Sequence, residues 1–242
     1  MKTALLVIAL GADYRPYLNQ LLESAKKFFV PHTPVVWSDD TVVLPHGGIV
    51  IPQRDLGFPQ STLQRYRMFY EQAGKLVNFD QVFYCDIDMT FVAPVTKTDI
   101  YSPGITATRH PGFMVYDRLD ESGVPVSIHG TPEYDPRSTA ALPLDADNRY
   151  YCGGFNGGDA QTFLAMSDTL RRNIDADTAR GFIAKWNDES HLNHYLYHNP
   201  PAKVLTPSFC YPEDYRGQWG WPPQQYSPIL IALNKAKPIW SR

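Results

Sequence analysis

The sequence lacks a run of apolar residues long enough to cross a membrane. A bilayer-spanning helix needs about 20 predominantly apolar residues, and no stretch of the 242-residue chain approaches that length. The chain opens with MKTALLVIALGADY, where a lysine precedes a short apolar run, as it does in a secretory signal peptide. Because this run leads directly into a helical pattern, we expect a buried first strand at residues 4–9 instead.

An excess of positive charge is also missing. The formal net charge is −3 and no basic run stands out, so we expect no nucleic-acid partner. Charged residues make up 19% and hydrophobic residues 43%, which excludes an intrinsically disordered chain. Aromatic residues reach 13%, and aromatic surfaces of this kind often stack on sugars or bases.

Cysteine is rare, and its number is odd. Cys85, Cys152 and Cys210 cannot all pair with one another, and Cys85 adjoins an acidic motif. We therefore expect free thiols in a reducing compartment. Together with the missing membrane span and leader, this predicts a soluble, cytoplasmic protein.

Strand and helix patterns alternate through the first half of the chain. The segments TPVVWSD and GIVIPQ have the β-branched composition of short strands. The segment STLQRYRMFYEQAGKL predicts a helix with Ser61 as its N-cap. The first helical pattern places apolar residues at helical spacing at Leu18, Leu21, Leu22, Ala25 and Phe29. This alternation predicts an α/β fold around a sheet that is parallel in its first half.

The second half is less regular. Residues 101–149 are polar and loop-rich, and resemble no regular element. The segments AQTFLAMSDTLRRNI and DESHLNHYLYHN predict two amphipathic helices. We find no internal repeat and no low-complexity linker, and the length suits one large domain.

Two aspartates interrupt the apolar segment VFYCDIDMTFV. Asp86 and Asp88 lie at or just past the end of a predicted strand, the place where open α/β sheets bind ligands. Two carboxylates so close together can hold Mg²⁺ or Mn²⁺ against a diphosphate. The alternatives are a solvated turn, or the nucleophile loop of haloacid-dehalogenase-like phosphatases, which DIDMT also fits. For the phosphatase we find no convincing second acidic pair.

Two glycine pairs lie four residues apart in RYYCGGFNGGDA. They indicate that the backbone passes close to a neighbouring group or adopts positive φ angles. A tight bend packed on another element would explain them. The adjacent rings of Tyr150, Tyr151 and Phe155 favour the floor of a sugar-binding site instead.

A third informative segment is KWNDESHLNHYLYH. Asp188 and Glu189 open a predicted helix whose dipole stabilises carboxylates, and Trp186 offers a flat face for a pyranose ring. A simple N-terminal helix cap is the alternative.

Three histidines follow in the same segment, at His191, His194 and His198. Only His194 and His198 share a helix face, and a zinc site would need a third ligand nearby.

The segments FYCDIDMTFV, RHPGF, YYCGGFNGGD and WNDESHLNHYL, in this order, resemble glycosyltransferase family 6. This family comprises retaining α1,3-galactosyl and N-acetylgalactosaminyl transferases, including the histo-blood-group A and B enzymes. The resemblance runs from about Tyr14 to the C-terminus. It implies a single-domain GT-A-type fold, Rossmann-like and nucleotide-sugar-binding, with a mixed central sheet. Residues 1–92 would form the nucleotide-binding part, and residues 93–242 the acceptor-binding part and C-terminal tail.

The resemblance also implies a donor site. Asp86 and Asp88 would hold Mn²⁺, or Mg²⁺, against the diphosphate of a UDP-sugar, and Asp188 would hold hydroxyls of the donor sugar. The other implied donor contacts are Tyr14, Arg65, Cys152, Gly153, Gly154, Lys235 and Arg242. The two glycines beside Cys152 leave volume for an acetamido group, which favours UDP-GalNAc over UDP-galactose.

The implied catalytic residue is Glu189, beneath the reacting carbon, as nucleophile or as stabiliser of positive charge. His110, Trp186 and Glu189 would contact the acceptor. The expected reaction is α1,3 transfer to a terminal β-galactoside. A sugar-binding module of the same fold with little turnover is the alternative. Vertebrate members carry a membrane anchor and stem that this sequence lacks, so the chain resembles a soluble microbial or viral homologue.

Overall fold

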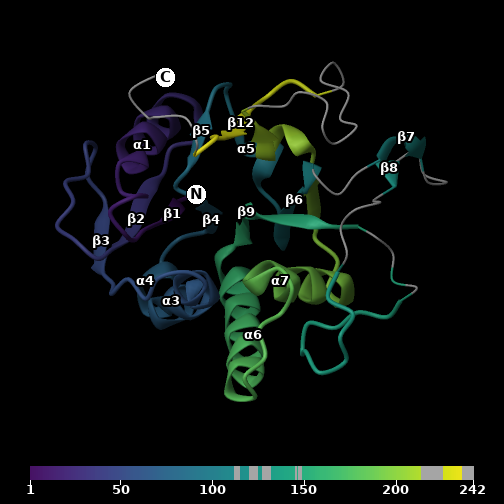
Figure 1. The fold of residues 1–242 in the computed structure, drawn as a ribbon. Helices are drawn as coiled ribbons and strands as arrows, with labels where there is room; N and C mark the ends of the chain where they lie inside the picture. Colours follow the sequence, from purple (N-terminus) through teal and green to yellow (C-terminus); the bar gives the residue numbers. More distant parts are fainter. Residues whose placement is uncertain are drawn as a thin grey trace.

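A seven-stranded sheet forms the centre of the molecule (Figure 1). The structure, a computed structural model, describes residues 1–111, 115–119, 125–126, 132–144, 146, 149–213 and 226–235. The strand order is β10-β6-β9-β4-β1-β2-β3. The strands are β1 (Thr3–Ala9), β2 (Thr33–Ser38), β3 (Ile49–Pro52), β4 (Gln81–Cys85), β6 (Ile105–Arg109), β9 (Tyr151–Asp159) and β10 (Lys203–Leu205).

Strand β9 gives the sheet its mixed character. It pairs antiparallel with β4 on one side and with β6 on the other, whereas the other neighbouring strands of this sheet pair parallel. The start of β9 therefore lies at the same edge of the sheet as the carboxyl ends of β1 and β4. The predicted α/β fold with a mixed central sheet is confirmed.

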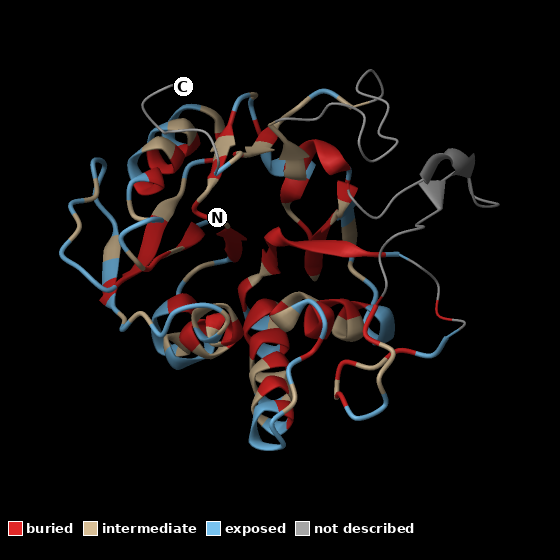
Figure 2. Ribbon diagram, viewed as in Figure 1, coloured by how far each residue is buried: buried red, intermediate tan, exposed pale blue. Residues whose placement is uncertain are grey.

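Each face of the sheet buries one set of alternating side chains. Along β1, Ala4 and Leu6 belong to one buried apolar cluster, and Leu5 and Val7 belong to the other. Helix α1 (Tyr17–Phe28) covers the second cluster. Helices α3 (Arg65–Glu71), α6 (Ala160–Ala179) and α7 (Asn187–His198) cover the first (Figure 1). Figure 2 shows β9 and the inner surfaces of the helices as buried. This burial on both faces explains the almost continuous apolar composition of the central strands.

The predicted first strand and three of the four predicted helices are confirmed. The five apolar residues predicted for the first helix are all buried, as expected, although Phe29 is the C-cap residue of α1. Helices α6 (Ala160–Ala179) and α7 (Asn187–His198) correspond to the two later predictions. In the described part of the chain, no helix combines the length and apolar character that crossing a membrane requires. The three cysteines are free thiols, as predicted.

The single helix predicted for residues 61–76 is wrong. Three short helices replace it: α2 (Gln60–Leu63), α3 (Arg65–Glu71) and α4 (Ala73–Leu76). Ser61 is also not the N-cap, because Pro59 holds that position. The Ser61 hydroxyl instead donates to the carboxylate of Asp55, 2.7 Å away, in the preceding loop.

The prediction that residues 101–149 are loop-rich missed a central strand. Strand β6 pairs with both β9 and β10. Its sequence, ITATR, buries Thr106 and Thr108 completely, so polar residues occupy core positions and hide the strand pattern. The Thr106 hydroxyl donates to the Ile100 carbonyl, 2.8 Å away, which lets it lie in the core.

Two smaller sheets and two short helical segments complete the described structure. One small sheet has the order β11-β12-β5, and the other pairs β7 with β8. These elements are β5 (Met89–Phe91), α5 (Lys97–Ile100), β7 (Val115–Leu119), β8 (Pro125–Val126), η2 (Pro207–Cys210), β11 (Tyr211–Pro212) and β12 (Leu230–Ala232).

The second glycine pair lies where β9 touches its neighbours. A Cβ on Gly157 would lie 2.3 Å from the Val82 carbonyl oxygen, and one on Gly158 would lie 2.0 Å from the Gly104 carbonyl oxygen. Gly158 also has a φ of +133°, which L-residues rarely adopt. The predicted close backbone approach is confirmed at these two positions.

We expect Gly158→Ala to lower the free energy of unfolding by at least about 2 kcal/mol, because the methyl group meets rigid backbone. Urea denaturation measures this. The control is Gly74→Ala in α4, where an added Cβ meets nothing within 4 Å. There we expect a gain of about 0.5 to 1 kcal/mol. Equal effects at the two positions would contradict the packing argument.

Candidate functional site

The two aspartates occupy a turn that joins two different sheets. Strand β4 ends just before Asp86, whose backbone N–H donates to the Gly154 carbonyl on β9, 2.8 Å away. Strand β5 begins just after Asp88, whose carbonyl accepts from the Leu233 N–H, 2.9 Å away. The apolar residues on both sides of the motif therefore belong to separate buried strands. This explains why carboxylates interrupt an otherwise apolar segment.

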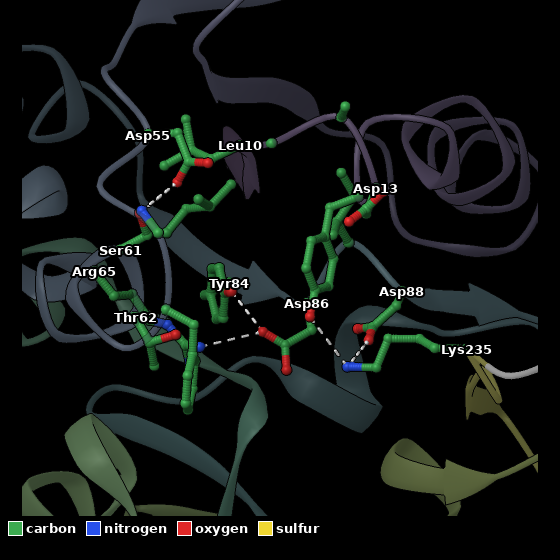
Figure 3. A pocket seen from close by; sticks show the side chains of 17 residues that line it. Leu10, Asp13, Asp55, Ser61, Thr62, Arg65, Tyr84, Asp86, Asp88 and Lys235 are labelled. Atoms are coloured by element: carbon green, nitrogen blue, oxygen red, sulfur yellow. Dashed lines mark hydrogen bonds and ion pairs between the residues drawn. The ribbon is translucent and has the colours of Figure 1, made fainter.

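Both carboxylates line a pocket of about 440 Å³ at the carboxyl ends of β1 and β4. This volume lies within the range of sites for small molecules. Figure 3 shows Asp88 and Lys235 on one side of the pocket and Asp55 with Ser61 on the other. The pocket thus extends from the acidic turn towards the loop that follows β3.

Arg65, at the start of α3, connects the groups around this pocket. Its Nε lies 3.2 Å from Asp188 Oδ2, and its Nη2 lies 3.4 Å from Asp86 Oδ1. Its Nη1 donates to the Gly153 carbonyl, 3.1 Å away. The guanidinium also lies over the Tyr84 ring, 4.5 Å from its centre. One buried cation therefore contacts groups on β4, β9 and α7.

Glu189 lies at the start of α7 and is fixed by β9. The Gly153 N–H donates to Glu189 Oε2 at 2.6 Å. Burial raises the pKa of Glu189 to about 7, and the nearby Asp188 charge adds to this rise, while the Gly153 N–H opposes it. Burial also raises the pKa of Asp188 to about 6, against the opposing charge of Arg65. The site thus holds two carboxylates that titrate near neutral pH.

The first glycine pair, Gly153 and Gly154, lets the charged side chains of the site approach β9 closely. A Cβ on Gly153 would lie 3.1 Å from Arg65 Nη1 and 3.3 Å from Glu189 Oε2. A Cβ on Gly154 would lie 3.0 Å from Asp86 Oδ2. Side chains at these positions would therefore crowd the charged groups that the site brings together.

Lys235 lies beside the acidic turn. Its ammonium is 3.1 Å from Asp88 Oδ2, and it donates to the Tyr14 hydroxyl at 3.4 Å. Burial and the charge of Asp86 raise the pKa of Asp88, and Lys235 opposes that rise. The close approach of an ammonium shows that this end of the pocket attracts cations.

The acidic turn offers two carboxylates to a divalent cation. Asp86 and Asp88 offer the hard oxygen ligands that Mn²⁺ and Mg²⁺ prefer. Over the described ranges, no group of three or more His, Cys, Asp or Glu side chains could hold a metal. Phosphate and water oxygens would have to supply the remaining ligands, as is usual for Mg²⁺.

Three other predicted site residues, His110, Trp186 and Cys152, do not line this pocket. His110 follows β6, its ring centre 6.0 Å from that of Tyr150, and burial lowers its pKa to about 4. Trp186 is the N-cap residue of α7 and is 41% exposed, so its ring faces solvent in part. Cys152 is buried at 1% exposure. Arg242 lies outside the described residues.

The histidines of α7 do not converge. His191 is buried, with its Nε2 3.7 Å from Asp177 Oδ2 on α6. His194 and His198 pack ring against ring, 4.7 Å between centres. These contacts give the three histidines a packing role within the described structure.

Sequence reasoning missed several residues of the pocket. The Tyr84 hydroxyl donates to Asp86 Oδ1 at 2.5 Å and so orients that carboxylate. Asp55 and Phe58 line the far end of the pocket, in the segment RDLGFPQS. This segment follows β3, and the rule that ligands bind beyond the carboxyl ends of strands could have identified it.

Comparison with known proteins gives consistent matches. The sequence model described as Glycosyltransferase family 6 matches residues 1–226. Over 150 residues the chain is 36% identical to Histo-blood group ABO system transferase 1 of Rattus norvegicus, covering 62% of this chain and 39% of the relative. Over 220 residues it is 26% identical to human Globoside alpha-1,3-N-acetylgalactosaminyltransferase 1. This match covers 85% of this chain and 59% of the relative. Over 158 residues it is 28% identical to O-antigen biosynthesis glycosyltransferase WbnI of Escherichia coli. This match covers 65% of this chain and 63% of the relative. The chain thus spans less than two thirds of each relative.

We expect Arg65→Leu to lower the free energy of unfolding at pH 8 by about 3 to 5 kcal/mol, because it leaves buried carboxylates without a counter-charge. Adding Asp188→Asn should restore part of this loss, since it removes one of those charges. Urea denaturation of both variants measures the effect. Arg137→Leu, an exposed arginine, should change stability little. Purely additive losses in the double variant would contradict a shared ion pair.

Proposed function

The chain belongs to glycosyltransferase family 6, and from this premise we propose that it is a retaining α1,3-hexosyltransferase. The donor is a UDP-sugar, with GalNAc favoured over galactose, and the acceptor is a terminal β-galactoside. One observation carries the proposal: Arg65 and Asp86 line the pocket, and contacts of Arg65 and Gly153 link them to Asp188 and Glu189. Family membership argues against the phosphatase alternative.

The acidic turn would bind the donor diphosphate. Asp86 and Asp88 would hold Mn²⁺ or Mg²⁺, which supplies Lewis-acid stabilisation of the negative charge on departing UDP. Lys235, beside Asp88, adds a positive charge at the same end of the pocket. Tyr84 and Arg65 contact Asp86 Oδ1 and so keep that carboxylate in one orientation.

Glu189 would stabilise the reacting sugar. As UDP leaves, positive charge develops on the anomeric carbon, and a carboxylate beneath it opposes that charge or attacks as a nucleophile. The Gly153 N–H holds one oxygen of Glu189, so the carboxylate does not have to reorganise during the reaction. Retention then follows from delivery of the acceptor hydroxyl to the face that UDP vacated.

The donor sugar would lie between the acidic turn and the start of α7. Asp188 would hold its hydroxyls, and Arg65, 3.2 Å from Asp188 Oδ2, would keep this carboxylate in place. The preference for UDP-GalNAc rests on the family resemblance of this glycine pair, because Arg65, Glu189 and Asp86 already approach Gly153 and Gly154 closely. Cys152 is buried beside them.

The acceptor would bind from the side of Trp186 and His110. The partly exposed Trp186 ring at the start of α7 suits stacking against a galactose. His110 is neutral at pH 7, because burial lowers its pKa to about 4, so it can accept or donate a hydrogen bond to a sugar hydroxyl.

We expect UDP release from UDP-GalNAc to require Mn²⁺ and to be stimulated by lactose. EDTA should abolish it, and Asp88→Asn should reduce it by about 10²-fold or more, because one metal ligand is weakened. A coupled UDP assay measures both, with UDP-galactose compared in parallel. Asp80→Asn, an exposed aspartate outside the pocket, is the matched control. Binding of galactosides without UDP release would favour the sugar-binding module instead.

The activity should rise with pH through about pH 7. Glu189 must be ionised to act, and burial raises its pKa to about 7, so protonation below that pH removes the carboxylate. The pH profile of kcat/KM for the donor checks this. Glu189→Gln should lower kcat by about 10³-fold or more and remove this limb of the profile. An unchanged limb in the variant would assign the titration to another group.

A further inference from the structure

A buried carboxylate outside the pocket contacts the backbone that carries Trp186. Glu133 does not line the pocket and is 7% exposed. Its Oε2 accepts from the Lys185 N–H, 2.8 Å away. Its Oε1 accepts from the Asp135 N–H, also 2.8 Å away. Each carboxylate oxygen therefore has a backbone donor, and one of these donors belongs to the residue just before Trp186.

The loop that carries Glu133 is closed on itself. We refer to residues 133–142 as the bracket loop, which contains turns but no helix or strand. The Glu133 carbonyl accepts from the Leu142 N–H, 2.8 Å away, so the two ends of the loop are joined. Leu142 and Ala140 bury their side chains. The bracket loop is thus packed against the rest of the protein.

Asp177 attaches the bracket loop to α6. This carboxylate is buried, and it accepts from the Ser138 hydroxyl at 2.6 Å and from the Thr139 N–H at 2.9 Å. The Thr139 hydroxyl donates to the Asn173 carbonyl on the same helix, 3.0 Å away. Buried polar groups with partners of this kind hold a segment in one arrangement. Glu133 therefore reaches the Lys185 N–H from a fixed loop.

The connection between α6 and α7 has an irregular backbone around Trp186. Asn187, the next residue, has a φ of +50°, which few residues other than glycine adopt. The Trp186 N–H donates to the Ser190 hydroxyl, and the Asn187 N–H donates to the Ala184 carbonyl, both at 2.9 Å. Such a conformation persists only where neighbouring contacts fix it. The position of the Trp186 ring therefore depends on these contacts and on that of Glu133.

Other contacts hold the carboxylates of the donor side. The Gly153 N–H, on β9, holds Glu189 Oε2, and Arg65 Nε lies 3.2 Å from Asp188 Oδ2. Neither of these contacts involves the bracket loop. A change in the bracket loop should therefore affect the acceptor side more than the donor side.

We propose that Glu133 is a positioning residue for the acceptor. In the proposed function, on which this inference rests, the Trp186 ring stacks on the terminal galactose. Stacking requires the ring to lie flat against the sugar, so a small displacement of the backbone weakens the contact. By accepting from the Lys185 N–H, Glu133 holds the Trp186 backbone where the acceptor needs it. Glu133 thus acts on the acceptor through Trp186 and does not touch the sugar.

Two variants of Glu133 test this. Glu133→Ala removes both contacts of the carboxylate, whereas Glu133→Gln keeps one oxygen and turns an NH₂ group towards the other N–H. We expect kcat/KM for lactose, measured by UDP release from UDP-GalNAc, to fall about tenfold in Glu133→Ala, and by less in Glu133→Gln. UDP release without lactose should stay within about twofold of the native rate, because the donor side keeps its contacts. The control is Asp135→Asn in the same loop, whose carboxylate pairs with Arg137, and it should change neither rate.

A double-variant cycle with Trp186→Ala separates positioning from a merely structural role. Without the Trp186 ring, Glu133 has no ring left to position. Adding Glu133→Ala to Trp186→Ala should therefore lower kcat/KM for lactose by less than about twofold. Lactose concentrations below saturation suffice for kcat/KM, so weak acceptor binding does not prevent the measurement.

The outcomes separate the inference from the proposed function. If both Glu133 variants lower UDP release equally with and without lactose, Glu133 supports the whole fold, and the inference is overturned. A full loss from Glu133→Ala in the Trp186→Ala background would overturn it as well. In both cases lactose-stimulated UDP release by the native chain leaves the proposed function standing. If the native chain releases no UDP from UDP-sugars with or without lactose, the proposed function fails, and this inference fails with it.

Discussion

Two carboxylates on separate elements, Asp86 after β4 and Asp188 at the start of α7, share the guanidinium of Arg65. The Asp188 side chain is 3% exposed and that of Arg65 is 11% exposed, so both are largely shielded from water. A buried ion pair of this kind adds little net stability, but breaking it is costly. Its main effect is positional: it fixes α3, β9 and α7 relative to the acidic turn. The pocket, the orientation of Asp86 and the placement of Glu189 all depend on that arrangement.

The direction of β9 makes this arrangement possible. If β9 ran parallel to β4, its first residues would lie at the opposite edge of the sheet, far from the acidic turn. Because it runs antiparallel, Gly153 and Gly154 come beside Asp86 without any side chain between them. The same strand carries a second glycine pair at its other end, where neighbouring backbone leaves no room for a Cβ. The first pair therefore leaves room for charged side chains, and the second pair lets the neighbouring strands approach β9 closely.

Much of the fold could be predicted, because apolar periodicity follows burial. It identified β1, α1, β4, α6 and α7, and the acidic turn was expected where β4 ends. Strand β6 was missed because Thr106 and Thr108 occupy core positions, and their hydroxyls hide the apolar pattern. Ser61 was assigned as an N-cap because serine favours that position, but a loop carboxylate binds its hydroxyl. The role of Arg65 as a link between three elements depends on contacts between residues far apart in sequence, which no local pattern encodes. Asp55 and Phe58 lie beyond the carboxyl end of β3, so the rule on strand ends could have indicated their segment, but their place in the pocket depends on the assembled fold.

The backbone contact between Leu233 and Asp88 has a consequence for how the chain can be shortened or rearranged. Strand β12 pairs with β5. The Leu233 N–H, just after β12, donates to the carbonyl of Asp88, the second aspartate of the acidic turn. The last described strand is therefore part of the scaffold of the turn, although it lies at the far end of the sequence. A boundary placed before residue 230 would leave the edge of β5 open and Asp88 without this backbone partner. New termini from circular permutation belong instead in an exposed loop away from this pairing.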